Sequence, residues 1–394
     1  MGVTNFNADS SPNYDSGAFL KTRAPLHEAY HLPPHIYNSS EIYAREKEEI
    51  FMKDWLCVAR VEEIDNPGDY MTRRVIDEPI IIARNEMGEI NAYANTCKHR
   101  GVEVASGSGN LKEFSCPYHG WLYDLNGLLV GAPYMKEADY FDPGSCQLNP
   151  LACDIWAGWV FVNFDTRAAP LAQFVARYDQ SFGMLQQENC RLGDKFAREV
   201  DCNWKFVNEN LQDVYHFQTL HANTFGEHVT AESFTYDLDR DTGGVAAFYP
   251  AAPTTFDGRS RFGKMPWMEE YPMNFARMGY MMPTMNIFAR VDMVIACVLW
   301  PLGPGKTRME WHSLFPAEFH KLADFDVKVK DYHDLLTMVV EEDQDMVASL
   351  QRNMASAKFA PGRMSIYETT VHNMIKGYLN RMFGCEREVS TENL

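Results

Sequence analysis

The most informative part of this sequence is a pair of short segments, Cys97-Lys98-His99-Arg100-Gly101 and Cys116-Pro117-Tyr118-His119-Gly120-Trp121. Each segment supplies one cysteine and one histidine. Soft thiolates and borderline imidazoles are the ligands that iron–sulfur clusters and zinc prefer. The glycine in each segment permits the tight backbone turn that brings two loops onto one centre. The pair therefore predicts a metal centre with two cysteine and two histidine ligands.

A structural zinc site with the same four ligands is the main alternative. Zinc sites more often place both cysteines on one loop and both histidines on another. The mixed loops of this chain therefore disfavour zinc and favour an iron–sulfur cluster. An accidental meeting of buried cysteines with unrelated histidines is the weakest interpretation.

The patterns C-x-H-R-G and C-P-Y-H-G-W resemble those of Rieske [2Fe–2S] domains. This resemblance implies that Cys97 and Cys116 hold one iron of the cluster, while His99 and His119 hold the other. Neutral imidazoles in place of two thiolates remove negative charge and raise the reduction potential. Such a cluster accepts an electron from a low-potential donor and passes it on, so a second redox centre is expected in the chain.

Short β-rich runs surround the two segments and predict an all-β module. They alternate with turns such as Asn66-Pro67-Gly68-Asp69 and with the hairpin loop Asp124-Leu125-Asn126-Gly127. Ahead of them, Ser39 and Ser40 can cap a helix over residues 43–55, whose acidic start a helix dipole favours. The predicted strands are residues 56–61, 70–75, 80–84, 90–94, 121–124 and 158–164.

The second half of the chain has a mixed pattern. Strands bracketed by long helices, without βαβ alternation, indicate an α+β domain with an antiparallel sheet. The expected helices are residues 172–189, 203–220, 319–358 and 365–383. The expected strands are residues 234–238, 245–249, 285–290, 293–300 and 308–315.

A second candidate metal site lies in a segment that runs from Glu209 through Asp213 and His216 to His221. In a helix, Glu209, Asp213 and His216 would share one stripe. His221 lies about 140° further round an undistorted helix than His216. Both imidazoles can meet one ion only if the helix ends or unwinds between them. Without further information, two histidines that simply pack in an amphipathic helix are the favoured interpretation.

The surrounding sequence changes this balance. The pattern E-N-x-x-D-x-x-H-x-x-x-x-H after Asn203-Trp204-Lys205 resembles the mononuclear iron segment of Rieske non-heme iron oxygenases, and the resemblance covers nearly the whole chain. It implies that His216 and His221 are two ligands of a 2-His-1-carboxylate triad, which leaves positions open for O2 on Fe(II). It also implies a helix-grip-like catalytic domain with an antiparallel sheet and long helices.

The third ligand is expected in the acidic run Glu341-Glu342-Asp343-Gln344-Asp345, which precedes Gln351. In the resembled family the ligand Asp commonly sits in an E-D pair eight residues before a Gln, which selects Asp343. An alignment through Met346, as in naphthalene-type members, selects Glu342 instead. A solvated acidic helix face is the alternative without a metal. We expect Asp343 to be the ligand.

The resemblance gives Asp213 a separate role. The matching Asp of the family lies between subunits and links a Rieske histidine of one protomer to an iron-binding histidine of the next. Here Asp213 would join His216 to the partner subunit's His119 and form the electron path, which implies a head-to-tail homotrimer. Glu209 either supports the same network or is a buried helix residue with satisfied hydrogen bonds, and both interpretations stay open.

The expected organisation has three parts. At 394 residues the chain exceeds what one hydrophobic core usually organises. Residues 1–40 are expected to form an N-terminal segment that packs on the catalytic domain. Residues 41–165 are expected to form the Rieske domain, and residues 166–394 the catalytic iron domain.

The amino-acid composition limits the expected cellular location of the protein and the kinds of partner that it binds. Lys and Arg number 36 and Asp and Glu 54, and this net charge of −18 argues against nucleic acid as a partner. The nine cysteines are scattered and odd in number, which indicates a reducing compartment rather than a disulfide framework. The N-terminus lacks the features of a secretory signal, and no apolar run reaches the roughly 18 residues of a membrane-spanning helix. A soluble, cytoplasmic protein that does not enter a membrane is expected.

The substrate is expected to be a small hydrophobic molecule, with an aromatic compound favoured. Residues 262–285 contain seven methionines, which either form an adaptable apolar pocket or, as the favoured interpretation, fill an irregular core. Family members that oxidise quaternary ammonium compounds can carry Glu at the position of Asp213, which argues against a charged amine. The chain length is nearer to that of homotrimeric members, which often hydroxylate or dealkylate. Monooxygenation is therefore favoured over cis-dihydroxylation.

Electrons must come from outside the chain. No G-x-G-x-x-G pattern opens a helix after a strand, so NAD(P)H is expected to act only through a separate flavin reductase, with or without a ferredoxin. Lys98, Arg100 and Lys112 lie on or near the cluster loops of an acidic protein and are expected to guide an acidic ferredoxin. An alternative of another class is a Rieske electron carrier fused to a ligand-binding domain without oxygenase activity.

Overall fold

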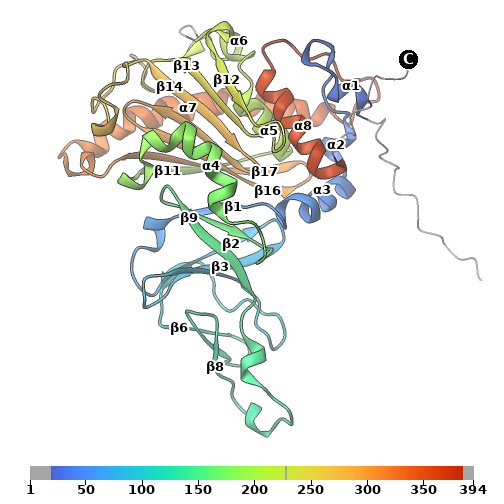
Figure 1. Ribbon diagram of the computed structural model, residues 1–394, viewed down its shortest axis with the longest axis vertical. Coiled ribbons are helices and arrows are strands. Elements are labelled where there is room, and N and C mark those ends of the chain that lie inside the picture. Colours follow the sequence, from blue (N-terminus) through green and yellow to red (C-terminus); the bar gives the residue numbers. More distant parts are fainter. Residues whose placement is uncertain (1–18, 227–228, 385–394) are drawn as a thin grey trace, which may run out of the picture.

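The computed structural model describes residues 19–226 and 229–384. Within these residues, the strands form two large antiparallel sheets and a small one, and the long helices lie on the sheet of the second half of the chain (Figure 1). This is the α+β architecture with an all-β module that the sequence predicts. Part of the N-terminal segment expected over residues 1–40 lies outside the described residues, and the three-part division of the chain stays a prediction.

The all-β module carries the two Cys-His segments near one end of the molecule (Figure 1). Its large sheet has the strand order β1-β10-β9-β4-β3-β2-β5, and its small sheet has the order β6-β7-β8. The first Cys-His segment follows β4, and the second joins β6 to β7. The strands are β1 (Leu56–Arg60), β2 (Asp69–Val75), β3 (Glu78–Arg84), β4 (Ile90–Ala94), β5 (Ser108–Asn110), β6 (Glu113–Ser115), β7 (Leu122–Asp124), β8 (Leu129–Gly131), β9 (Pro150–Trp156) and β10 (Trp159–Asn163).

The second large sheet has the order β11-β17-β16-β15-β14-β13-β12 among the described strands. Its interior strand β16 is buried continuously from Val294 to Pro301, since both of its faces are covered. The sequence did not predict β11 and β14. The strands are β11 (Cys190–Val200), β12 (Thr235–Leu238), β13 (Val245–Pro250), β14 (Phe275–Met281), β15 (Met285–Arg290), β16 (Val294–Gly303) and β17 (Lys306–Pro316).

The helices begin and end at recognisable signals. Ser39 caps α3 as expected, because its side chain accepts a hydrogen bond from the Ile42 N–H at 3.3 Å. The long helix expected over residues 319–358 is shorter and covers Phe325–Asn353. The helices are α1 (Leu20–Arg23), α2 (His35–Asn38), α3 (Ser40–Glu46), α4 (Leu171–Phe182), α5 (Trp204–Gln212), α6 (Phe217–Leu220), α7 (Phe325–Asn353) and α8 (Thr369–Phe383). None of the described helices is long and apolar enough to cross a bilayer.

Helix α5 is fixed in the middle of the second half of the chain. It contacts α7 and α8 on one side and β14, β16 and β17 on the other. Its first turn is anchored by the fully buried Glu46 of α3, which pairs with the Lys205 ammonium at 2.5 Å. Trp204 and Tyr378 donate to the same carboxylate, each at 2.8 Å. A paired and hydrogen-bonded buried charge of this kind holds its partners in one geometry. It therefore fixes the first turn of α5, and the rigid helix in turn positions its C-terminal end.

Candidate metal centres and substrate cavity

Both Cys-His segments form the same tight turn. The Gly101 N–H donates to the Cys97 carbonyl at 2.8 Å, and the Gly120 N–H donates to the Cys116 carbonyl at 3.0 Å. Both glycines have positive φ angles, +80° and +71° respectively, which residues with a side chain rarely adopt. The two loops therefore present their cysteine and histidine in the same way.

The four side chains of these loops converge, with the cysteines inside and the histidines outside. Cys97 and Cys116 are each 3% exposed, whereas His99 and His119 are exposed. The Nδ1 atoms of the two rings lie 3.1 Å apart and so point at one small volume. Burial raises the pKa of the Cys116 thiol, and a hydrogen bond from the Tyr118 N–H opposes that shift. Two inner thiols and two outward-lying imidazoles fit the donor set of a Rieske cluster.

The basic residues beside these loops lie on the surface. Lys98, Arg100 and Lys112 are all exposed. Lys98 contacts the Asn149 side chain at 2.5 Å, and the Arg100 guanidinium lies 5.5 Å from the centre of the Tyr118 ring. Their expected part in docking a ferredoxin stays a prediction.

The two histidines of the second site flank a single helical turn. Helix α5 ends at Gln212, and Asp213 already has extended backbone angles of φ −77° and ψ 120°. Helix α6 then covers only Phe217–Leu220, between His216 and His221. The helix therefore ends before the second histidine, as the spacing required. The expected single helix through this segment is wrong, because the chain leaves the helical conformation at Asp213.

Two side chains that flank α6 and one from α7 converge at this break. His216, His221 and Asp343 each offer one ligand atom, and these atoms lie within 4.8 Å of one another. The two Nε2 atoms are 3.2 Å apart, and Asp343 Oδ1 lies 3.2 Å from His221 Nε2 and 3.6 Å from His216 Nε2. Within the described residues, this buried oxygen has no hydrogen-bond partner. An unpaired buried carboxylate oxygen beside two imidazole nitrogens fits a divalent cation, and the donor set is that of a non-heme Fe(II) site.

The outer nitrogens of the two imidazoles contact other carboxylates. His216 Nδ1 lies 2.9 Å from Asp213 Oδ2, and His221 Nδ1 lies 2.7 Å from Glu342 Oε2. Such contacts fix the tautomer that presents Nε2 to an ion. Burial lowers the pKa of His221, but Asp343 and Glu342 outweigh that effect and raise it overall. Glu342 therefore lies behind His221, whereas Asp343 faces both histidines.

Glu209 has different partners. Its carboxylate accepts the Tyr37 hydroxyl, with oxygen distances of 2.9 Å and 3.1 Å. Burial raises the pKa of Glu209 to about 7. No hydrogen bond between described residues links it to Asp213 or His216, because the expected helical stripe is interrupted where α5 ends. The Tyr37 contact is that of a buried helix residue, and a supporting part for Glu209 in the electron path stays a prediction.

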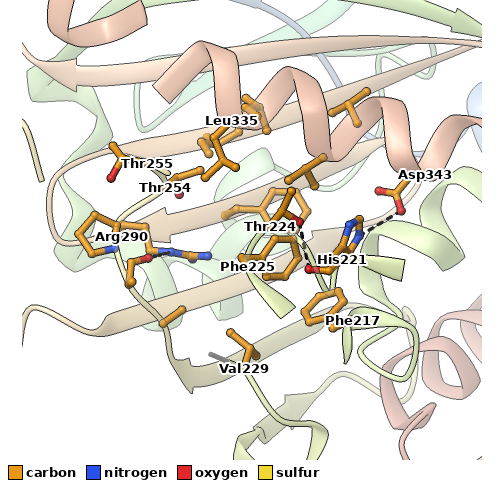
Figure 2. A pocket seen from close by; sticks show the side chains of 18 of the residues that line it. Phe217, His221, Thr224, Phe225, Val229, Thr254, Thr255, Arg290, Leu335 and Asp343 are labelled. Atoms are coloured by element: carbon orange, nitrogen blue, oxygen red, sulfur yellow. Dashed lines mark hydrogen bonds and ion pairs between the residues drawn. The ribbon is translucent and has the colours of Figure 1, made fainter. Parts of the chain in front are cut away.

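A cavity of about 130 Å³ opens beside the three converging side chains (Figure 2). Since a cavity of about 150 Å³ holds benzene, this space suits a small molecule. None of residues 262–285 lines it, and Met265, Met268 and Met278 of that segment are instead fully buried in the core. The aromatic side chains of its wall are Phe217, Phe225, Tyr249, Phe256, Phe288 and Trp311.

Two polar residues of this site were missed from the sequence. Thr224 follows α6, and its hydroxyl donates to Glu342 at 3.1 Å. Arg290 is the last residue of β15 and lines the cavity. A charged residue at the end of an apolar strand was a usable signal, but the face to which it belongs depends on the pairing of β15 in the sheet.

The two candidate centres of one chain lie far apart. Figure 1 shows β6 and β8, beside the Cys-His loops, near one end of the molecule and α6 near the opposite end. An electron that moved between them within one chain would have to travel most of the long axis.

The class of protein follows from the two centres together. An exposed imidazole-bearing site can pass on electrons, and a three-ligand iron site beside a cavity can use them on a bound molecule. This combination defines the Rieske-type non-heme iron oxygenases. Family comparison agrees, because residues 54–150 match the Rieske [2Fe-2S] domain and residues 187–384 match the ring hydroxylating alpha subunit (catalytic domain).

The chain belongs to the family of Rieske ring-hydroxylating oxygenase alpha subunits. The predicted family, the predicted fold class and the pair of cofactors, a Rieske [2Fe–2S] cluster and a mononuclear iron, are thereby confirmed.

Individual relatives differ in how much of the chain they match. The carnitine monooxygenase oxygenase subunit of Acinetobacter baumannii is 36% identical over 211 residues, which is 52% of this chain and only 56% of that protein. The alpha subunit of 2-aminobenzenesulfonate 2,3-dioxygenase from Alcaligenes sp is 30% identical over 307 residues, 75% of this chain and 77% of that protein. A crystal structure of a quaternary ammonium Rieske monooxygenase superposes with a TM-score of 0.75 at 25% identity, covering 90% of this chain and 96% of that one.

Proposed function

We propose that this chain is the terminal oxygenase of a multicomponent Rieske system that oxidises a small quaternary ammonium compound by monooxygenation, through hydroxylation or dealkylation. The observation that carries the proposal is the convergence of His216, His221 and Asp343 at the wall of an aromatic-lined cavity. These three residues would hold the mononuclear iron. The cluster would be held by Cys97, His99, Cys116 and His119.

The chain's own residues contribute orientation and enclosure. When bound, the cluster supplies electrons and the Fe(II) supplies the activation of O2. Asp213 and Glu342 hold the Nδ1 side of the two imidazoles, so that both Nε2 atoms face the ion position. The aromatic walls exclude water and hold the substrate next to that position.

The walls of the cavity also bear on the kind of substrate. Ring faces attract cations, and trimethylated ammonium groups are recognised in this way. The relatives named for carnitine and for quaternary ammonium compounds support such a substrate.

The expectation of an aromatic substrate finds no support in the carnitine and quaternary ammonium relatives. It rested in part on Asp213, which does not line the cavity and contacts His216 Nδ1 instead. The side chain at that position therefore carries no direct information on the substrate.

The route of the electrons is proposed to run between protomers. The Asp213 side chain is 20% exposed beside His216, and the two centres of one chain lie at opposite ends of the molecule (Figure 1). In a head-to-tail homotrimer the partner subunit's His119 would reach Asp213. A separate flavin reductase, alone or with a ferredoxin, would deliver electrons to the cluster near Lys98, Arg100 and Lys112.

The test is turnover of the reconstituted protein with O2 and a surrogate reductase, followed by the mass of the product. γ-Butyrobetaine and L-carnitine are the quaternary ammonium probes, and naphthalene is the aromatic one. The proposal predicts about three irons per chain, with a gain of one oxygen or loss of an alkyl group from a quaternary probe. Alanine at both His216 and His221 should abolish turnover and leave the cluster intact. Turnover that survives this double change, or about two irons per chain with no product, contradicts the proposal and favours an electron carrier.

A second candidate function is cis-dihydroxylation of an aromatic acid. It is favoured by the dioxygenase relative that matches 75% of this chain at 30% identity. The same experiment separates the two candidates when 2-aminobenzenesulfonate is added as a probe, since dihydroxylation adds two oxygen atoms from O2.

A further inference from the structure

We propose that Arg290 forms an anion-binding subsite at the end of the cavity opposite the iron-binding residues, where it takes an acid group of the substrate. The chemistry is that of an oxyanion, a carboxylate or a sulfonate. The inference rests on the proposed function and narrows its substrates to molecules that carry an acid group at one end and the oxidised group at the other.

Arg290 is the source of positive charge in the cavity wall. The described lining residues include no other arginine and no lysine. No carboxylate among the described residues forms an ion pair with its guanidinium. Its hydrogen bonds run instead from Nε to the Ala252 carbonyl at 3.2 Å, and from Nη1 to the Ala289 carbonyl at 3.0 Å and the Tyr249 hydroxyl at 3.2 Å. Leaving a half-buried cation without a counter-ion costs free energy, and an anionic ligand would offset that cost.

The guanidinium is also held ready for a ligand. Three hydrogen bonds fix it, and its centre lies 5.4 Å from the centre of the Tyr249 ring. Nη2 has no hydrogen-bond partner among the described residues, so this edge of the group is available. Arginine binds carboxylates through a planar array of donors, and a fixed array loses little entropy when it binds.

Arg290 places a positive charge at one end of the cavity, and the iron-binding residues lie at the other end. Figure 2 shows Arg290 on one side of the cavity, His221 and Asp343 on the other, and Phe225 between them. An acid group bound by Arg290 would be held at the end of the cavity away from His221 and Asp343. A molecule bound in this sense would turn its far end towards the iron-binding residues. Arg290 would thus select the substrate and also determine which of its atoms is oxidised.

The contacts of Arg290 also allow a purely structural role. Its bond to Tyr249 ties β15 to β13, and its bond to Ala252 ties β15 to the segment that follows β13. Loss of such a tie would lower stability and weaken all ligands alike. The subsite, in contrast, predicts a change in the ratio between acid and neutral ligands, which the experiment must measure.

The experiment uses the holoprotein and two matched pairs of probes. One pair is γ-butyrobetaine with its alcohol analogue, 4-hydroxybutyltrimethylammonium, and the other is benzoate with benzyl alcohol. Dissociation constants are measured by calorimetry for the wild type, Arg290→Gln and Arg290→Lys. Arg308→Gln serves as control, because Arg308 lies on β17 outside the cavity lining and contacts Glu310 at 3.4 Å.

The wild type is expected to bind the acid of at least one pair about 10- to 100-fold more tightly than its neutral partner, the range of a hydrogen bond to a charged group. Arg290→Gln should remove this preference, Arg290→Lys should keep part of it, and Arg308→Gln should keep all of it. Failure of both acids to bind, absence of an acid preference in both pairs, or an undiminished preference in Arg290→Gln overturns the subsite.

Turnover separates this inference from the proposed function. If Arg290→Gln oxidises γ-butyrobetaine as well as the wild type does, the subsite fails and the proposed function stands. If the wild type oxidises neither quaternary probe but binds benzoate in preference to benzyl alcohol, the proposed substrate class fails and the subsite stands.

Discussion

Changing Glu342 to alanine should weaken iron binding without removing an iron ligand. Glu342 Oε2 accepts from His221 Nδ1 at 2.7 Å and from Thr224 Oγ1 at 3.1 Å. A hydrogen bond to a charged group contributes about 1.5–3 kcal/mol. Part of this is recovered when water replaces the carboxylate, so we expect Fe(II) to bind about 10- to 100-fold more weakly. Asp343→Ala removes a charged ligand and should weaken Fe(II) more than about 100-fold.

The measurement is competition for Fe(II) between the mononuclear site and a chelator. The visible absorption of the cluster, recorded in the same samples, shows whether the Rieske domain is intact. Glu341→Gln is the matched control, because Glu341 lies on the same helix with a side chain that is 62% exposed and only a 4.0 Å contact to Arg198. Its affinity for Fe(II) should equal that of the wild type.

Two results would refute this reasoning. If Glu342→Ala removes the mononuclear iron and Asp343→Ala retains it, then Glu342 is the ligand and the geometry has been misread. If both variants bind Fe(II) like the wild type, the carboxylate comes from elsewhere and the triad is wrong.

Three further predictions concern stability, electron transfer and the turn after α6. Burial raises the pKa of Glu209 from 4.5 to about 7, so the unfolded chain ionises this residue at lower pH than the folded chain does, and the contribution of Glu209 to stability falls as pH rises through this window. The Glu209→Gln variant should therefore gain up to about 3 kcal/mol of stability relative to the wild type between about pH 5 and pH 8. A stability difference in thermal unfolding that does not change with pH contradicts this. Asp213→Ala should slow the oxidation of the reduced cluster by O2 about 10- to 100-fold, measured by stopped-flow absorption in samples reconstituted to the same mononuclear iron content as the wild type, and an unchanged rate excludes the proposed electron path. In Gly226→Ala the new Cβ would lie 2.2 Å from the Phe217 carbonyl oxygen and 2.8 Å from the His221 carbonyl oxygen. This variant should therefore lose mononuclear iron and about 1–3 kcal/mol of stability. Gly303→Ala is the control, because its new Cβ has nothing within 4 Å, and it should retain its iron and its stability in the same assays.

The cluster loops could be predicted from the sequence because their information is local. The cysteine and histidine are two residues apart in the first loop and three apart in the second, and the glycine that closes each turn follows the histidine within two residues. The hydrogen bonds from Gly101 to Cys97 and from Gly120 to Cys116 lie within single loops. No knowledge of the rest of the fold is needed to expect these turns.

The second site could be predicted only in part. The spacing of His216 and His221 required a helix end, but the end at Gln212 and the extended backbone of Asp213 could not be read from propensity. They depend on how α5 packs between the sheet and α7 and α8. The edge strand β11 was missed for a related reason, because its mostly half-buried residues, five of which are charged, become a strand only by pairing with the distant β17.

The substrate was the part of the function that the sequence motif could not specify. In the iron-binding segment, Asp213 contacts His216 Nδ1 and Glu342 contacts His221 Nδ1. These side chains orient the two histidines towards the ion position and do not contact a substrate. The side chains that would touch a substrate come mainly from β13, β15, β17, α7 and the loops between strands. Arg290 illustrates the consequence, since its place in the cavity follows from the register of β15 against β14 and β16. A motif shared by a family therefore predicts the chemistry at the metal, whereas the charge and shape of the distant wall decide which molecule is presented to it.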